Sequence, residues 1–184
     1  MLNTFVVHVE NKPGVLTRVA SLFRRRAFNI DSLTVGRTEK PEVSRMTITA
    51  EADFDQARRI EANLYKLVNV LLVENITNEP AMTRDLAMIK VAATHEARSH
   101  VLELANVFRG RVVDVAPESL TIEITGAEDK IDGLLEVLRP YGVIEMVRTG
   151  IVAMRRGAKS AADTASGPHA LAQIAGDENV SYSV

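Results

Sequence analysis

The residue types best suited to bind a small ligand occur in the segment Asn11-Lys12-Pro13-Gly14-Val15-Leu16, where a strand-like stretch changes into a helix-like one. The first amide groups of a helix lack internal partners and carry the positive end of its dipole, so this junction suits a carboxylate. Gly14 lets a ligand approach the main chain closely, Pro13 stiffens the entry, and the Asn11 amide can donate and accept. A purely structural interpretation stays open, because Pro-Gly is a common turn and Asn a common helix cap.

Other reactive groups are few. The chain has no Cys, which excludes disulfides, thiolate nucleophiles and Cys-type metal sites and fits a reducing compartment. His95 and His100 are five residues apart, about 140° around a helix, whereas a zinc helix motif places both ligands on one face. His8 is expected on a sheet face rather than as a catalytic base. The short motifs of acyl transfer and nucleotide binding are absent, so we expect neither a metal site nor catalysis.

Charge and hydropathy exclude two classes of partner. The 22 Lys+Arg against 24 Asp+Glu give a formal net charge of -2, so no overall electrostatic attraction to nucleic acid or an anionic membrane is expected. The only basic run, Arg24-Arg25-Arg26, is expected at a helix C-terminus, where it complements the dipole. The apolar run Val70–Val73 is far too short to span a membrane, and Met1–Thr4 does not open a signal peptide. We therefore expect a cytoplasmic protein.

The elements that must position the Asn11–Leu16 segment follow from the hydrophobic pattern. Apolar residues at helical spacing predict a helix from Val15 to about Arg26, and a second helix follows from Ala57. Strand-like segments cover residues 2–10, 28–38, 43–52 and 68–76. The resulting order, β-α-β-β-α-β, is that of a ferredoxin-like domain.

The same order recurs in the second half of the chain. Strand-like segments cover residues 86–93, 112–115, 120–125 and 143–147, with helical patterns over 97–108 and 131–138. Short echoes, such as Leu33-Thr34-Val35 and Leu120-Thr121-Ile122, favour a repeat. We therefore predict an α+β protein of two tandem ferredoxin-like βαββαβ lobes, residues 1–78 and 82–156. The Ala-, Gly- and Ser-rich residues 157–184 are predicted to form a disordered tail.

Several segments resemble one known family. They are Glu10–Val19, Phe28–Val35, Ser44-Arg45-Met46-Thr47-Ile48 and Leu67–Val70 in the first half, and Phe108–Val115 and Arg148–Val152 in the second. Together they closely resemble the small, regulatory subunit of acetolactate synthase (acetohydroxyacid synthase), whose first lobe is an ACT domain. The resemblance covers roughly residues 1–157.

The resemblance implies a protein without catalysis of its own. Its partner would be the large catalytic subunit, which uses thiamine diphosphate, Mg²⁺ and FAD to condense two pyruvates, or pyruvate with 2-oxobutyrate, in branched-chain amino-acid biosynthesis. No cofactor would bind to this chain. The chain would raise the activity of the large subunit and make it sensitive to feedback inhibition by valine.

The resemblance also implies where the effector binds. Family ACT domains pair side by side as a homodimer, and the effector lies at their interface. Carried over to this sequence, the site comprises Asn11, Gly14, Val15 and Leu16 of one chain with Asn29 and Ile30 of the other. Valine, leucine and isoleucine differ by about one methylene, worth roughly 1–3 kcal/mol, so a graded preference is expected.

The second lobe has Thr94-His95-Glu96-Ala97 in place of the Pro-Gly loop. No equivalent effector site is expected there, and contact with the catalytic subunit or support of the dimer is its expected role. Two alternatives to the family assignment stay open at this point. One is a free-standing tandem ACT amino-acid sensor acting on another partner, and the other is an unrecognised small enzyme.

Overall fold

The structure, a computed structural model, describes residues 1–157. It contains two successive βαββαβ lobes, as predicted. The predicted tail begins at Gly157, and its residues 158–184 lie outside the described part of the chain. None of the helices in the described part is long and apolar enough to cross a membrane.

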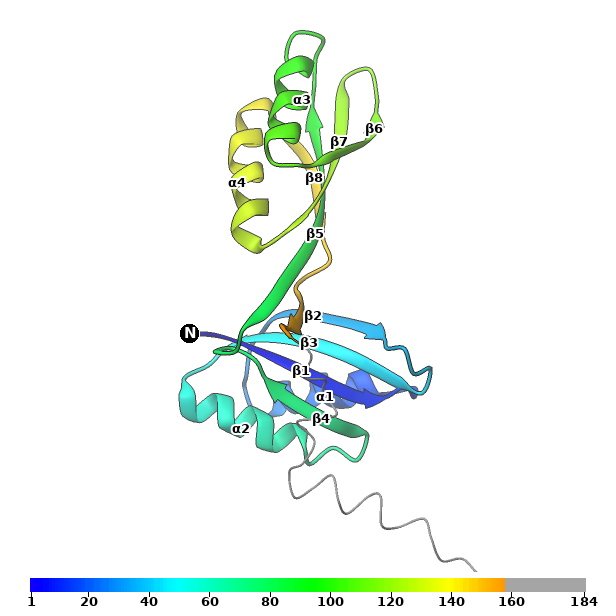
Figure 1. The fold of residues 1–184 in the computed structure, drawn as a ribbon, viewed down its shortest axis with the longest axis vertical. Helices are drawn as coiled ribbons and strands as arrows, with labels where there is room; N and C mark the ends of the chain where they lie inside the picture. Colours follow the sequence, from blue (N-terminus) through cyan, green and yellow to red (C-terminus); the bar gives the residue numbers. More distant parts are fainter. Residues whose placement is uncertain (158–184) are drawn as a thin grey trace, which may run out of the picture. The chain divides into compact units, whose positions relative to one another are not determined.

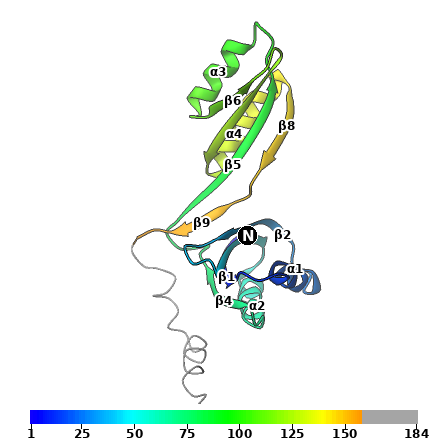
Figure 2. The same cartoon turned by 90° about the vertical axis from the view of Figure 1, so that its right-hand side faces the viewer.

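The first lobe is one four-stranded sheet with two helices on one face (Figures 1 and 2). The strands run in the order β2-β3-β1-β4, and β1 lies antiparallel to both of its neighbours. The elements are β1 (Leu2–Glu10), α1 (Val15–Arg25), β2 (Ile30–Arg37), β3 (Val43–Glu51), α2 (Phe54–Leu64) and β4 (Val70–Asn75).

The two helices follow from local sequence and from burial of one face. Helix α2 begins with a reciprocal capping box, in which the side chains of Asp53 and Gln56 each accept from the main-chain amide of the other. Arg24 and Arg25 lie in the last turn of α1, where their charge complements the helix dipole, as predicted. The helices bury Val15, Val19, Leu22, Phe23, Ala57, Ile60 and Leu64 against the sheet.

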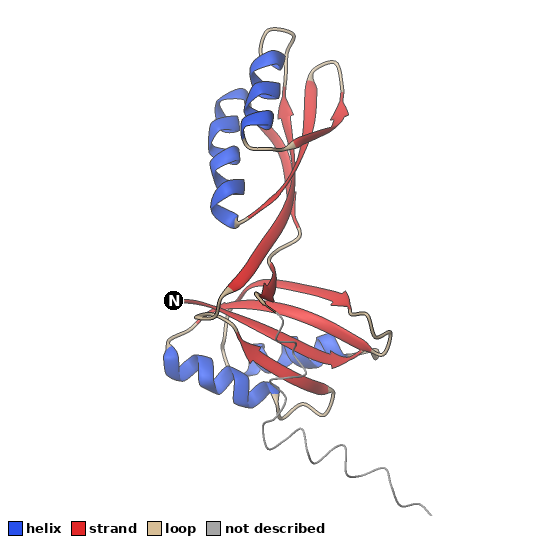
Figure 3. Ribbon diagram, viewed as in Figure 1, coloured by secondary structure: helices blue, strands red, loops and turns tan. Residues whose placement is uncertain are grey.

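The second lobe repeats this architecture around its own core (Figure 3). Its sheet has the order β6-β7-β5-β8, with β9 pairing with β5. The elements are β5 (Ala81–Ala92), α3 (Arg98–Val107), β6 (Arg111–Val115), β7 (Ser119–Gly126), α4 (Glu128–Leu138), a 3-10 helix η1 (Arg139–Tyr141), β8 (Val143–Arg148) and β9 (Val152–Arg155). The sequence did not predict β9, η1 or the early start of β5.

The two lobes match residue by residue over their first strand and helix. Pairing with the edge strand shifts between His8 and Val9 in β1, and between Lys90 and Val91 in β5. The first helix of each lobe, α1 and α3, is followed by a residue with a positive φ of 54°, Ala27 in the first lobe and Arg109 in the second. Each residue of β1 and α1 therefore corresponds to the residue 82 positions later, as His8 does to Lys90 and Ala27 to Arg109.

This register corrects one detail of the sequence interpretation. The segment Leu33-Thr34-Val35 lies in β2, whereas Leu120-Thr121-Ile122 lies in β7, the counterpart of β3. The similarity of these two segments therefore matched strands that are not equivalent. It arises because both segments alternate apolar and polar residues. The element order, and not the echo, reveals the repeat.

Candidate functional site

The Asn11–Gly14 loop leads from β1 into α1, and its shape depends on Gly14. Gly14 is the N-cap residue of α1 and has φ 83° and ψ -8°, a left-handed conformation that glycine adopts without strain. A Cβ atom built there would meet no other atom within 4 Å. The main-chain conformation at position 14 therefore favours glycine, and the space beside its Cα atom is open.

Asn11 fastens the loop to the β2–β3 hairpin and does not cap the helix. Its main-chain N–H donates to the carbonyl oxygen of Glu42 at 2.7 Å, and its side-chain Nδ2 donates to that of Pro41 at 2.9 Å. No side chain caps the start of α1. The capping interpretation of Asn11 is therefore wrong.

The first turn of α1 presents main-chain donors with no partner in the described chain. The first regular helical hydrogen bond runs from the Arg18 N–H to the Gly14 carbonyl oxygen at 3.0 Å. Within residues 1–157, the N–H groups of Leu16 and Thr17 have no acceptor, and the first turn contains no acidic side chain. These donors and the helix dipole make this helix start attractive to an anion.

The side chains of the next two residues point in different directions. Val15 belongs to the core, with 4% of its surface exposed, whereas Leu16 is 44% exposed. In this single chain Val15 therefore offers a ligand no exposed side chain, and its N–H donates to the Lys12 carbonyl oxygen at 3.4 Å, whereas Leu16 offers an apolar side chain and a free N–H.

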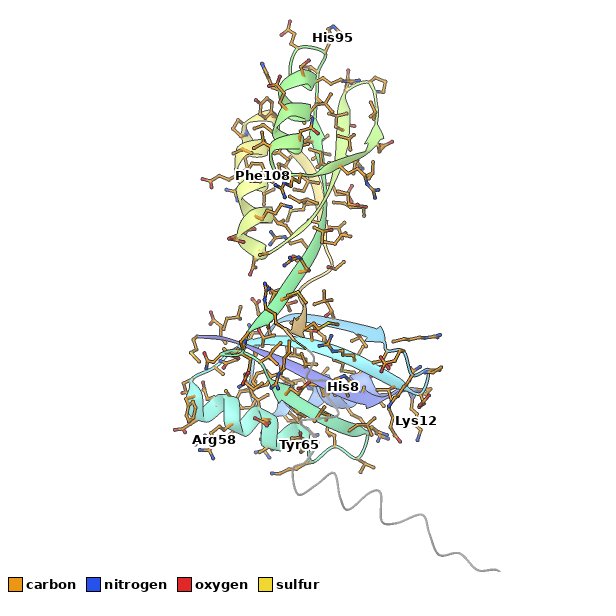
Figure 4. The ribbon with its side chains drawn as sticks, in the orientation of Figure 1. His8, Lys12, Arg58, Tyr65, His95 and Phe108 are labelled. Carbon is orange, nitrogen blue, oxygen red and sulfur yellow. The ribbon has the colours of Figure 1, made fainter. Side chains whose placement is uncertain are left out.

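Asn29 and Ile30 lie at the opposite end of the sheet from the loop. Asp31, the next residue, accepts a hydrogen bond from Thr49 Oγ1 at 3.2 Å, and Thr49 pairs with Thr4 of β1. The loop begins after Glu10, six residues beyond Thr4, which is roughly 20 Å along a strand. Figure 4 shows Lys12 at the hairpin end of the sheet. One chain therefore does not bring the two groups of predicted site residues together.

A series of side-chain hydrogen bonds lies beside the loop. The sequence analysis did not predict these contacts. Glu10 Oε1 accepts from Lys12 Nζ at 3.0 Å, and its other oxygen accepts a short hydrogen bond from Asn69 Nδ2. Asn69 Oδ1 in turn accepts from Arg18 Nη1 at 2.6 Å. The hydrogen bonds from Asn69 and Lys12 lower the pKa of the Glu10 carboxyl. No local sequence signal links Asn69 to this loop, because it follows α2.

The corresponding junction of the second lobe is built differently. Arg98 takes the place of Leu16, and its Nη2 atom donates to the carbonyl oxygens of Ala93, Ala116 and Pro117 at 3.3, 2.7 and 2.5 Å. A guanidinium therefore ties this loop to the β6–β7 turn, as Asn11 ties the first loop to its hairpin. Within the described residues the N–H groups of Ser99 and His100 also lack an acceptor, so the second junction differs from the first in its arginine anchor and not in having a capped helix start.

The three histidines of the described residues, His8, His95 and His100, belong to no candidate metal cluster. His95 precedes α3, whereas His100 lies within it, and the described residues contain no group of three or more His, Cys, Asp or Glu placed to hold a metal ion. His8 is partly buried on a sheet face opposite Arg45, as predicted. Burial and the charge of Arg45 lower its pKa.

Comparison with known proteins adds a consistent result over both lobes. A family model described as an AHAS small subunit-like ACT domain matches residues 5–72, and one described as the small subunit of acetolactate synthase matches residues 84–157. A probable acetolactate synthase small subunit of Archaeoglobus fulgidus is 50% identical over 159 residues, which cover 86% of this chain and 99% of the relative.

Two further relatives carry the same family name. The acetolactate synthase small subunit of Mycobacterium bovis is 48% identical over 155 residues, 84% of this chain and 92% of its own. The crystal structure of the acetolactate synthase small subunit from Thermotoga maritima superposes with a TM-score of 0.81 at 40% identity, covering 86% of this chain and 99% of that one.

Proposed function

Because this chain belongs to the acetolactate synthase small-subunit family, we propose that it activates the large catalytic subunit and makes that subunit sensitive to feedback inhibition by valine. The small subunit is the regulatory subunit of this enzyme, so the chain has a regulatory role and the large subunit is its partner. Activation, the effector and its site are the content of the proposal. In it, thiamine diphosphate, Mg²⁺ and FAD belong to the partner, and this chain carries none of them.

The observation that carries the effector proposal is the open start of helix α1. The donors of Leu16 and Thr17, beside the uncrowded Gly14, suit the carboxylate of a free amino acid. The ammonium group of the same ligand can donate hydrogen bonds to main-chain carbonyl oxygens and to the side-chain oxygen of Asn29. The exposed Leu16 and the partly buried Ile30 offer apolar contacts to a small branched side chain.

A second copy of the chain completes this site. Among the strands of residues 1–157, β2 lies at the edge of its sheet and pairs with β3 alone, and its last residues lead into the hairpin to which Asn11 is bonded. If β2 pairs antiparallel with β2 of a second copy, the start of one strand lies beside the end of the other. Asn29 and Ile30 of the copy then approach the Asn11–Leu16 loop, which supports a homodimer with two shared sites.

The proposal is tested by mixing the purified chain with its large subunit and measuring acetolactate formation with and without L-valine. We expect the chain to raise the rate and valine to lower it again, with leucine and isoleucine acting at graded concentrations. Valine binding without any effect on acetolactate formation would instead indicate a sensor for another partner. Turnover by the chain alone would contradict the regulatory role.

A further inference from the structure

Asn69 joins the two residues that bracket the effector loop. Its side chain donates to Glu10, the last residue of β1, and accepts from Arg18 in the first turns of α1 at 2.6 Å. Its carbonyl oxygen also accepts from the Glu10 main-chain N–H at 2.9 Å. One residue therefore holds the chain immediately before and after the segment 11–17.

The second lobe shows which of these contacts the fold itself requires. The main-chain bond from Glu10 to Asn69 has an equivalent in the bond from the Ala92 N–H to the Gly142 carbonyl oxygen at 2.8 Å. Gly142 has no side chain, and the second lobe nevertheless forms the same strand pairing with the same shift between Lys90 and Val91. The fold therefore needs the main-chain bond and can do without the side chain of Asn69.

The side-chain contacts among Glu10, Lys12, Arg18 and Asn69 have no counterpart beside the corresponding loop of the described second lobe. By the correspondence of 82 positions, Glu10, Lys12 and Arg18 are replaced in the second lobe by Ala92, Thr94 and His100. None of these three replacements combines with Gly142 into a similar series of hydrogen bonds, because Gly142 has no side-chain amide. A set of four residues that the fold does not need, and that appears beside one loop and not beside its duplicate, serves that loop.

We propose that Asn69 is a positioning residue of the effector site, which holds the Asn11–Leu16 loop in its ligand-binding arrangement by bridging Glu10 to Arg18. The bridge keeps the Glu10 carboxylate hydrogen-bonded to Asn69 and Lys12, which reduces its repulsion of an incoming carboxylate. Together Lys12, Glu10 and Arg18 leave the loop flanked by one net positive charge. This inference rests on the proposed effector site and extends it to a residue outside the loop.

The test compares L-valine binding by the full-length homodimer in calorimetry for the wild type, Asn69→Ala, Asn69→Asp and Asn63→Ala. Asn63 is the matched control, because its Nδ2 donates to the Arg59 carbonyl oxygen within α2 and its hydrogen bonds involve none of Glu10, Lys12 and Arg18. We expect Asn69→Ala to raise the Kd about tenfold and Asn63→Ala to leave it within about twofold. Activation of the large subunit should be the same for the wild type and Asn63→Ala.

Asn69→Asp separates positioning from simple space filling. Asp has the shape of Asn and still accepts from Arg18, but it cannot donate to Glu10 and places a second carboxylate against it. We expect this variant to bind valine at least as weakly as Asn69→Ala. A Kd equal to that of the wild type for either Asn69 variant, or an equal loss for Asn63→Ala, would overturn the inference. If the wild type itself binds no branched-chain amino acid, the proposed effector site fails instead.

Discussion

The side-chain amide of Asn11 donates a hydrogen bond to the main-chain carbonyl oxygen of Pro41 at 2.9 Å, which fastens the α1 entry loop to the β2–β3 hairpin. The loop and the hairpin that follows the edge strand β2 therefore form one unit. In a homodimer paired through β2, this unit would face the start of the other copy's strand.

Gly14→Asp is expected to abolish the response to valine while leaving activation of the large subunit intact. A new carboxylate about 4 Å from that of the ligand costs on the order of 4 kcal/mol at an effective dielectric constant of 20, or about a thousandfold in affinity. The measurement is the valine concentration that halves acetolactate formation.

Gly14→Asn is the matched control for this change. Asn and Asp both tolerate the left-handed conformation of Gly14 better than most residues, and the space beside it is open to either side chain. The two variants therefore differ mainly in charge, and Asn should cost much less affinity. If the Asp variant still responds at the wild-type valine concentration, the loop is not the effector site.

Mixed dimers test whether the site is shared between two chains. One chain carries Gly14→Asp and the other carries Asn29→Ala, so that one site contains both changes and the other contains neither. Calorimetry should then find one valine site per dimer with wild-type affinity. Two intact sites, or none, would show that the loop and the start of β2 do not act across the dimer.

Arg98→Ala is expected to destabilise the second lobe by about 2 kcal/mol, since three carbonyl oxygens lose a charged donor. Urea unfolding measures the loss, and valine binding should not change. Arg84→Ala is the control, because the exposed Arg84 guanidinium bonds only to the neighbouring Thr83 carbonyl oxygen. Equal stability of the two variants would mean that Arg98 does not tie the loop to the β6–β7 turn.

His8→Gln is expected to weaken the dependence of stability on pH between about 7 and 5. Burial and Arg45 lower the pKa of His8 in the folded state below its ordinary value of 6.5, although Glu74 and Glu39 oppose this shift. The unfolded chain then binds more protons than the folded one below pH 6.5, so the wild type loses stability as the pH falls.

The measurement for His8 is the urea midpoint at pH 7 and at pH 5 in both proteins. His8→Gln should show the smaller decrease, because Gln does not titrate. His95→Gln, a change in the exposed loop before α3, serves as the control of the same residue type. A decrease in the His8 variant as large as that of the wild type would contradict the assignment.

Helices and strands whose apolar residues recur at regular spacing were predictable from the sequence. Helix α1 was expected from Val15 to about Arg26 and ends at Arg25, and β3 was expected over residues 43–52 and ends at Glu51. In both, the residues that face the core already show the pattern of the element before any tertiary contact is known.

The parts that were missed depend on distant partners. Strand β5 begins at Ala81 rather than Leu86, and the charged Asp85 within it is 4% exposed. Its carboxylate accepts from Thr149 Oγ1 at 3.0 Å and faces Arg148 Nε at 3.7 Å. These partners lie more than sixty residues away, so a local pattern cannot reveal that a buried carboxylate belongs in the strand. The link between Asn69 and the effector loop is hidden for the same reason.

The duplicated fold also supplies a reference within the molecule for spectroscopy. Thr17 in the first turn of α1 and Ser99 in α3 occupy matched positions, and both are exposed. The chain contains no Cys and no Trp, so a thiol-linked label or an indole introduced at either position gives a signal without background. A label at 17 would report binding at the proposed effector site together with changes in buffer, temperature and salt, whereas a label at 99 would report the solution conditions alone.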